Sequence, residues 1–208
     1  MEGLTGTSTT LRFLQEENQR LRAANDQLSE EMSGIKDVLK SLRGLQQVIS
    51  HLDTRVELQP LLDRILYEAL CVVDAADGSL ILFDGDTNEL VFVLVRGHLA
   101  ETLQGHRMPA DTGVAGWVMA HGEPVIANNV QQDERFYAAV DMLFHFRTES
   151  LAGVPLISRG RVLGVIEMVN KFSGHPFSDK DLEVLMLLAP IAATAIDLAS
   201  VVAEKDQS

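Results

Sequence analysis

The sequence predicts an α+β domain, built from one antiparallel β-sheet with helices on its faces and preceded by a long N-terminal coiled-coil helix. Two observations predict this architecture. Apolar residues recur every seven positions through the first fifty residues, and short β-branched or apolar runs separated by turn signals begin at Ser79. Helical patterns precede, interrupt and follow these runs, which is typical of helices that cover an antiparallel sheet.

The N-terminal segment carries an unbroken seven-residue repeat, whose apolar members are Leu14, Leu21, Leu28, Ile35, Leu42 and Ile49. Such a seam keeps facing one partner only when two helices supercoil. Asn18 and Asn25 fall at a positions, where paired asparagines favour a parallel two-stranded register. We therefore predict a disordered N-terminus over residues 1–10 and a parallel, homodimeric coiled coil over residues 11–52. The alternative is a lone amphipathic helix packed on its own domain.

The globular part is predicted over residues 53–203 and starts with a helix near Pro60, a residue that suits a first helical turn. The segments "DGDTNE" and "SRGR" have lengths suited to antiparallel hairpins. Asp111 or Thr112 is suited to cap a short helix that Gly122 ends. An Ala-rich helix closes the domain, before a tail over 204–208. The predicted strands are residues 79–83, 90–95, 124–127, 151–157 and 162–169.

Composition and motifs exclude several classes of function. The net charge of −13 has no offsetting basic patch, so we expect no nucleic-acid partner. Cys71 is the only cysteine and the six histidines lack metal-ligand spacing, so we expect neither a disulfide nor a metal site. Neither a phosphate-binding loop nor an activated nucleophile is present, so we expect no enzyme.

The same sequence predicts a cytoplasmic protein with no membrane partner. The N-terminus lacks the basic start and apolar core of a signal peptide. The apolar stretch over residues 184–203 contains Pro190 and ends its uninterrupted part at Asp197, so we expect a buried terminal helix rather than a membrane span.

Three stretches carry a resemblance to a known family. They are "MPADTGVAGWV" (108–118), "FYAAVDMLFHFRTESLAGVPL" (136–156), and "GVIEMVNK" (164–171) with Phe177 and Asp181. On these residues the chain resembles GAF domains over about residues 53–203, and more narrowly the GAF domains of cyclic-nucleotide phosphodiesterases and adenylyl cyclases. The resemblance implies a GAF-type antiparallel sheet flanked by helices, with a pocket between the sheet and the segment before the "FRT" strand.

The resemblance also assigns candidate ligand-binding residues, which are Ser79, Arg96, Ala115, Phe136, Asp141, Phe146, Thr148 and Glu167. The carboxylates and hydroxyls are suited to bond a base or ribose, and the phenylalanines are suited to wall a base. Arg96 stands where guanine-binding relatives carry a carboxylate, which favours cAMP over cGMP. Each residue also has an ordinary alternative role in a strand, cap or core. No cofactor is assigned, and cAMP or another small molecule is the candidate ligand.

A second motif is predicted to be a structural latch, made of Asn170, Lys171, Phe177 and Asp181. The family's signature is N-K followed by F-x-x-x-D-E, and in this chain Leu182 stands at the last position. In the family the lysine and the aspartate pair with each other and tie the last hairpin to the terminal helix. Ser178 is suited to cap that helix together with Asp181.

The predicted function is therefore a homodimeric sensory module that binds a small ligand and signals through its helical bundle. Its output is expected in a partner protein or in a downstream effector domain. The alternative is a ligand-free dimerisation and protein-docking scaffold, in which phenylalanine and leucine side chains fill the pocket. A polar-lined cavity favours the sensor, and a packed interior favours the scaffold.

Overall fold

The structure is a computed structural model that describes residues 17, 20, 22 and 58–206, with side chains as far as Ser200. It divides the chain into two units, Met1–Gln47 and Val48–Ser208, and the description below is of the second unit. The segments predicted over residues 1–10 and 11–52 lie outside the described residues, except for three positions. All three of these, Glu17, Arg20 and Arg22, are helical.

The described part of the second unit is an α+β domain around one six-stranded antiparallel sheet, in the order β3-β2-β1-β6-β5-β4. The first and last strands of the domain, β1 and β6, are thus neighbours at the centre of the sheet. The strands are β1 (Ala75–Asp84), β2 (Glu89–Arg96), β3 (Arg107–Pro109), β4 (Val125–Ala127), β5 (Leu151–Ser158) and β6 (Arg161–Lys171).

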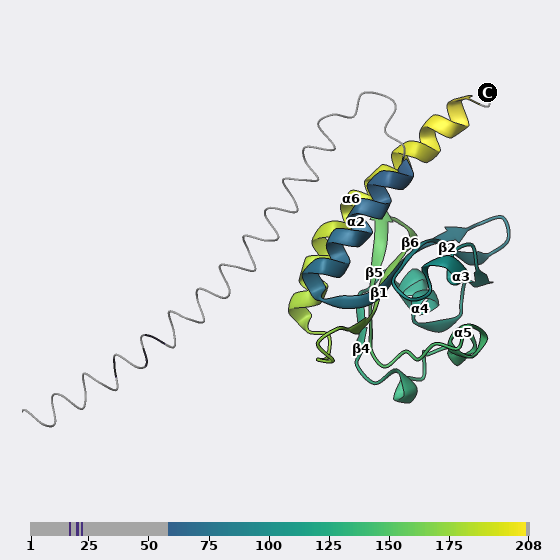
Figure 1. The fold of residues 1–208 in the computed structure, drawn as a ribbon. Coiled ribbons are helices and arrows are strands. Elements are labelled where there is room, and N and C mark those ends of the chain that lie inside the picture. The colour runs from purple at the N-terminus through teal and green to yellow at the C-terminus, as the bar shows by residue number, and fades with distance from the viewer. Residues whose placement is uncertain (1–16, 18–19, 21, 23–57, 207–208) are drawn as a thin grey trace, which may run out of the picture. The chain divides into compact units, whose positions relative to one another are not determined.

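Helices cover both faces of this sheet (Figure 1). α2 (Leu58–Val73) and α6 (Asp179–Asp206) lie side by side on one face. The other face carries α3 (Ala100–Leu103) and α4 (Gly113–His121), with the 3-10 turn η1 (Val130–Gln132) and α5 (Ala138–Phe144) in the connection from β4 to β5.

Burial on both faces explains why the central strands have nearly continuous apolar sequences. In β1 the side chains of Leu80 and Ile81 are both fully buried, although successive residues of a strand point to opposite faces. Ile81 belongs to the core cluster with Val114 and Val118 of α4. Ser79, two residues before Ile81, therefore points to the α4 face, where the candidate pocket is predicted.

The predicted hairpin at "SRGR" joins β5 and β6 through a tight turn. Arg159 and Gly160 have φ angles of 48° and 75° between Ser158 and Arg161, which are paired across β5 and β6. Such a pair of left-handed residues is typical of a tight hairpin turn. The short elements β3, α3 and η1 were not predicted, because three or four residues give too little periodicity.

The two ends of α4 are capped differently. Gly122 ends the helix in the left-handed conformation, as predicted, and its N–H donates to the carbonyl of Val118. Thr112 occupies the N-cap position, but no side chain caps the helix, contrary to the prediction for Asp111 or Thr112. The Thr112 hydroxyl lies 3.4 Å from Asp111 Oδ1 instead.

The terminal helix runs through Pro190 without a break. Its stretch Asp179–Ser200 is long and apolar enough, by length and composition, to cross a membrane, contrary to the expectation that this segment falls short. A core helix of a soluble domain meets the same criteria. Leu185, Leu188 and Ala192 are buried where α6 packs on β5 and α2. Only 39% of the apolar window is buried, so the predicted burial holds for one side of the helix.

Candidate functional site

A cavity of about 90 Å³ lies between the α4 face of the sheet and the segment that connects β4 to β5. A single water molecule needs roughly 10–15 Å³, so this part of the interior is hollow rather than closely packed. Side chains of β1, β2, β6, α3, α4 and α5 contribute to the lining. Most of it is apolar, from Phe92, Val95, Leu99, Leu103, Met108, Val114, Phe136, Val140, Phe146, Leu151 and Val169.

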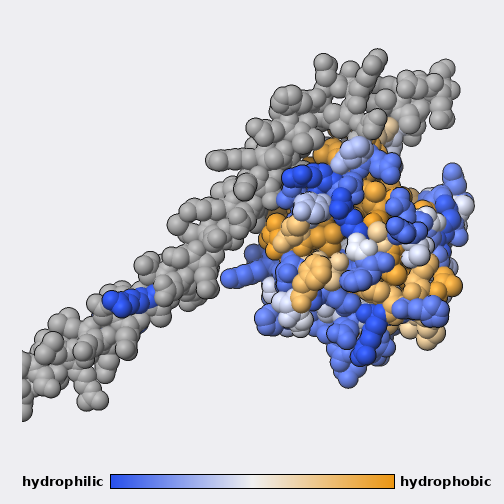
Figure 2. Space-filling view, viewed as in Figure 1, coloured by the Kyte–Doolittle hydropathy of each residue, from blue (hydrophilic) through white to orange (hydrophobic). Residues whose placement is uncertain are grey.

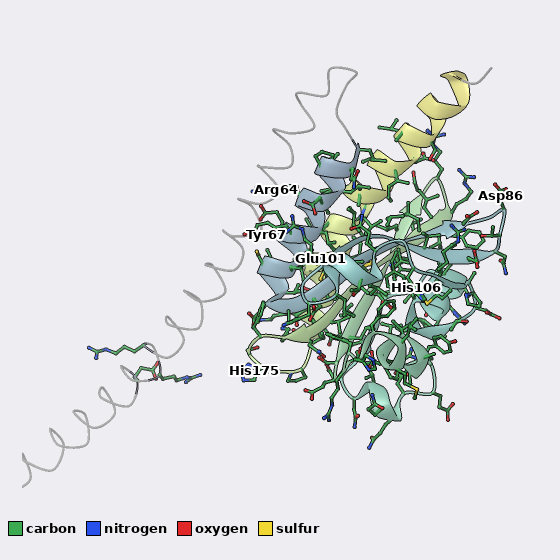
Figure 3. The ribbon with its side chains drawn as sticks, turned by 45° about the vertical axis from the view of Figure 1, so that its right-hand side comes forward. Arg64, Tyr67, Asp86, Glu101, His106 and His175 are labelled. Carbon is green, nitrogen blue, oxygen red and sulfur yellow. The ribbon has the colours of Figure 1, made fainter. Side chains whose placement is uncertain are left out.

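Seven of the eight predicted ligand-binding residues line this cavity, namely Ser79, Ala115, Phe136, Asp141, Phe146, Thr148 and Glu167. The eighth, Arg96, lies outside the lining. Val95 points into the cavity, so the next residue along β2 points to the α2 face. There Arg96 Nε donates to Asp63 Oδ1 at 2.8 Å, and its guanidinium carbon lies 5.1 Å from the ring centroid of Tyr67. Tyr67 projects outward from α2 (Figure 3).

Glu167 is the most unusual polar residue of the lining. Its position in β6 pairs with Ser79 of β1 and Gly153 of β5, so it lies in the middle of the sheet. The residue is only 8% exposed, and no donor in residues 58–200 contacts its carboxyl group. Burial raises the pKa of Glu167 to about 7, because the cavity solvates the charged form poorly. Near neutral pH both forms are present: the neutral acid donates and accepts hydrogen bonds, and the carboxylate only accepts them.

Asp141 and Thr148 bind each other across the turn that follows α5. The Thr148 N–H donates to Asp141 Oδ2 and the Thr148 hydroxyl donates to Asp141 Oδ1, both at 2.7 Å. His145, between them, has a φ of 53° and ends α5. Both carboxylate oxygens of Asp141 thus already accept a hydrogen bond from Thr148. These two bonds hold the turn after α5, which is part of the cavity wall, in place.

Sequence reasoning did not single out Asp77, which also lines the cavity. Asp77 precedes Ser79 by two residues and therefore shares its face of β1, so strand periodicity alone would have identified it. It is 7% exposed and its Oδ1 accepts the backbone N–H of His98 at 2.5 Å. The lining thus contains the carboxyl groups of Asp77, Asp141 and Glu167, and no lysine, arginine or histidine.

Among the lining residues, the start of α4 and the hydroxyls of Ser79 and Thr148 supply donor groups. Gly113, Val114 and Ala115 all line the cavity. Their backbone N–H groups have no acceptor within the described residues, because Thr112 does not cap the helix. The first N–H groups of a helix, together with its dipole, favour an anionic or acceptor group. The cavity therefore offers donors on α4 and carboxyl groups on the sheet.

The four latch residues lie outside the cavity lining. Lys171, Phe177 and Asp181 tie β6 to α6, whereas Asn170 bonds the backbone at Arg147–Ser150 instead. Lys171 Nζ lies 2.8 Å from Asp181 Oδ2, and each of the two side chains is 12% exposed. The same oxygen accepts the backbone N–H of Ser178 at 2.7 Å and its hydroxyl at 2.8 Å. Phe177 is buried, and the Lys171 ammonium lies 5.4 Å from its ring centroid.

The residues described here do not form a metal site of the usual kind. In the part of the chain that the structure describes, no group of three or more His, Cys, Asp or Glu side chains is placed to hold a metal ion. Two of the three carboxyl groups of the lining already have protein partners, His98 for Asp77 and Thr148 for Asp141.

Sequence comparison identifies cyclic-nucleotide phosphodiesterases as relatives. The chain is 32% identical over 152 residues to the Drosophila melanogaster "Dual 3',5'-cyclic-AMP and -GMP phosphodiesterase 11", covering 66% of this chain and 10% of that protein. It is 31% identical over 167 residues to the Takifugu rubripes "Dual 3',5'-cyclic-AMP and -GMP phosphodiesterase 11A", covering 76% and 18%. The chain thus spans between a tenth and a fifth of the length of these relatives.

Structural comparison shows the same fold in proteins of low sequence identity. The GAF domain of a phosphoenolpyruvate-protein phosphotransferase from Coxiella burnetii has a TM-score of 0.68 at 18% identity, covering 80% of this chain and 98% of that one. The corresponding Acinetobacter domain has a TM-score of 0.64 at 23% identity, covering 79% and 98%. The family model described as "GAF domain" matches residues 56–197. The chain therefore belongs to the GAF domain family.

Proposed function

We propose that this chain is a homodimeric sensory module, which binds a small molecule in the cavity and signals through α2 and α6. The observation that carries the proposal is the buried carboxyl group of Glu167, which faces the cavity without a protein partner. In residues 58–200 no fully buried polar side-chain atom lacks a partner, so the Glu167 oxygens are accessible from the cavity. A ligand that hydrogen-bonds the ionised Glu167 there contributes about 1.5–3 kcal/mol.

A cyclic nucleotide is the candidate ligand. The relatives named above are phosphodiesterases of cyclic AMP and cyclic GMP. The free N–H groups of Gly113, Val114 and Ala115 are suited to a cyclic phosphate, and Glu167 is suited to the N–H groups of a base or the hydroxyl of a ribose. Because Arg96 lies outside the lining, its charge gives no direct contact that ranks cAMP above cGMP. Both nucleotides therefore enter the test.

Binding of a nucleotide would require the cavity to widen. Its volume of about 90 Å³ is below the roughly 300–1,000 Å³ that is typical of sites for ligands of drug size. The weakest part of the wall is α5, none of whose seven residues is buried. A ligand that binds the widened arrangement more tightly shifts the domain toward it, which is the condition for a sensor.

The test is isothermal titration at pH 7 with cAMP, cGMP and 5′-AMP, on protein refolded from denaturant to remove any bound molecule. The variant Glu167→Ala is expected to bind at least tenfold more weakly, since hydrogen bonds to charged groups contribute about 1.5–3 kcal/mol. Glu149→Ala is the matched control, because Glu149 is exposed and outside the lining. Absence of heat with every nucleotide would remove this candidate ligand, and mass spectrometry of molecules released on unfolding would then search for another.

The same proposal includes a cytoplasmic location, no catalytic activity of the chain itself, and output through a partner protein or an effector domain. The homodimer is proposed to form through the N-terminal heptads and the exposed side of α6, where Leu187 and Leu198 are 53% and 51% exposed. Ala192 and Ala193 of the same helix are buried inside the protomer, so the proposed contact does not include them. Light scattering at micromolar concentration is expected to show two chains per particle, and a monomer would contradict the dimer.

A ligand-free docking scaffold is the second candidate. Large apolar side chains stand on the surface, among them Met142 and Leu143 of α5, which are 73% and 60% exposed, and Phe172, which is 74% exposed. Figure 2 shows that hydrophobic and hydrophilic surface alternate on the face in view. Glu167→Leu separates the two functions, because filling the cavity abolishes a ligand response and leaves a docking surface intact.

A further inference from the structure

We propose that Asn128 and Asn170 couple the two ends of the cavity-covering segment to α6. Asn128 acts through the connector that leads into α6, and Asn170 acts through its neighbour in β6, Lys171. The covering segment is defined as residues 128–150, between β4 and β5, and it contributes Phe136, Tyr137, Val140, Asp141, Phe146 and Thr148 to the lining. The connector is residues 172–178, between β6 and α6. In the proposed sensor, these contacts would pass a movement of the cavity wall to α6. The contacts themselves do not depend on the proposed function, which supplies only the ligand that causes the movement.

The first tie is a two-point contact at the start of the covering segment. Asn128 follows directly after β4, and its Nδ2 donates to the carbonyl oxygen of Phe177 at 2.8 Å. The N–H of Phe177 donates back to Asn128 Oδ1 at 2.7 Å. One side chain thus occupies both backbone groups of a buried residue 49 positions away, immediately before the turn that starts α6.

The second tie holds the end of the covering segment. Asn170 Oδ1 accepts the N–H groups of Glu149 at 2.8 Å and Ser150 at 3.1 Å. Its Nδ2 donates to the carbonyl oxygen of Arg147 at 3.0 Å. The next residue, Lys171, holds Asp181 in the first turn of α6. Two adjacent residues of β6 therefore join the cavity wall at Arg147–Ser150 to the terminal helix.

Between its two ties the covering segment is held by partly buried contacts. Phe136, Val140 and Phe144 pack against the core, and the Arg135 guanidinium lies 5.0 Å from the Trp117 ring centroid. α5 buries none of its residues, and of the segment's apolar residues before β5 only Val130 is fully buried. Phe144 makes one further contact, edge-on to the ring of His106 with centroids 5.2 Å apart, and His106 lies in the body of the domain (Figure 3). On this proposal, a displacement of the wall that widens the cavity is passed through the two ties to the connector and to α6.

The experiment is amide hydrogen exchange by mass spectrometry on the full chain without ligand. Asn128→Ala is expected to speed exchange about 10- to 30-fold in the first turn of α6, because it removes two hydrogen bonds from the connector. Asp181→Asn, at the other end of the route, is expected to speed exchange in residues 136–148, which Asp181 does not contact. The double variant is expected to show less than the product of the two separate effects, which demonstrates coupling.

The controls separate coupling from general loss of stability. Asn129→Ala removes the same type of side chain one position on, where the exposed Asn129 side chain makes no hydrogen bond within the described residues, and it is expected to leave α6 unchanged. Asn128→Asp keeps the acceptor for the Phe177 N–H and is expected to give an intermediate effect. Asn170→Gly tests the second tie, since glycine tolerates the φ of 52° at this position.

The result that overturns the proposal is faster exchange confined to the neighbourhood of each substitution, or independent effects in the double variant. Should Asn128→Ala fail to fold, Asn128→Asp and Asn170→Gly carry the same comparison. No ligand is used, so the outcome is independent of the nucleotide titration. A titration without heat removes the candidate ligand, whereas unchanged exchange in α6 removes the ties as a route of coupling.

Discussion

The substitution Glu167→Gln is expected to change how the stability of the domain depends on pH. Burial raises the pKa of Glu167 from its ordinary value of 4.5 to about 7. One pKa unit corresponds to about 1.36 kcal/mol, so the ionised form of Glu167 is less stable in the folded domain than in the unfolded chain by about 3 kcal/mol. The folded state binds the proton more tightly than the unfolded state does. This destabilisation is therefore absent below pH 4.5, grows between pH 4.5 and 7, and is complete above pH 7.

The measurement is urea unfolding followed by circular dichroism at several pH values from 4.5 to 8.5. Relative to the wild type, Glu167→Gln is expected to gain about 3 kcal/mol of unfolding free energy across this range, because glutamine does not titrate. Any cost of burying the amide is independent of pH and leaves the slope unaffected. Glu149→Gln, on the exposed end of the covering segment, is expected to follow the wild-type slope. Parallel curves for the wild type and Glu167→Gln would refute the placement of an unpartnered carboxyl group in the cavity.

Three further substitutions test the packing around the site by chemical denaturation. Lys171→Met is expected to lower the unfolding free energy by about 1.5–3 kcal/mol, since it removes a charged partner of Asp181, whereas the exposed Lys180→Met is expected to change little. Thr148→Val is expected to cost about 1 kcal/mol through the lost hydroxyl bond to Asp141, and Thr148→Ser is expected to restore most of it. Gly164→Ala is expected to cost at least about 1–3 kcal/mol, because the added methyl group would overlap the carbonyl oxygen of Ile81. Gly85→Ala is its control, since the nearest atom, Phe83 Cε1, lies at an ordinary 3.7 Å; equal losses in the two would contradict this account.

The sequence predicted the sheet well because its strands are long and apolar enough to show their period. The seven lining residues were identified through motif resemblance, and alternation along β1 explains why Ser79 faces the cavity. The same alternation explains the error for Arg96, since one step along β2 from Val95 reverses the face. β3 and α3 were missed because they span three and four residues.

Contacts between distant segments were the least predictable part of the site. The Asn128 side chain hydrogen-bonds the backbone of Phe177, 49 positions away, and no local sequence pattern predicts such a pairing. The free N–H groups on α4 depend on a Thr112 side chain that turns to Asp111 instead of capping the helix. The burial of Glu167 follows from its place at the centre of the sheet, between Ser79 and Gly153, which is set by the order of all the strands.

The pairing of β1 with β6 brings the two ends of the domain together, because α2 leads into one strand and α6 leaves after the other. A domain whose chain enters and leaves at neighbouring points is easily inserted into a larger polypeptide, because the flanking segments remain close together. Any rotation or sliding of α2 against α6 then changes the relative position of the two chain segments that enter and leave the domain, and these segments lie close together.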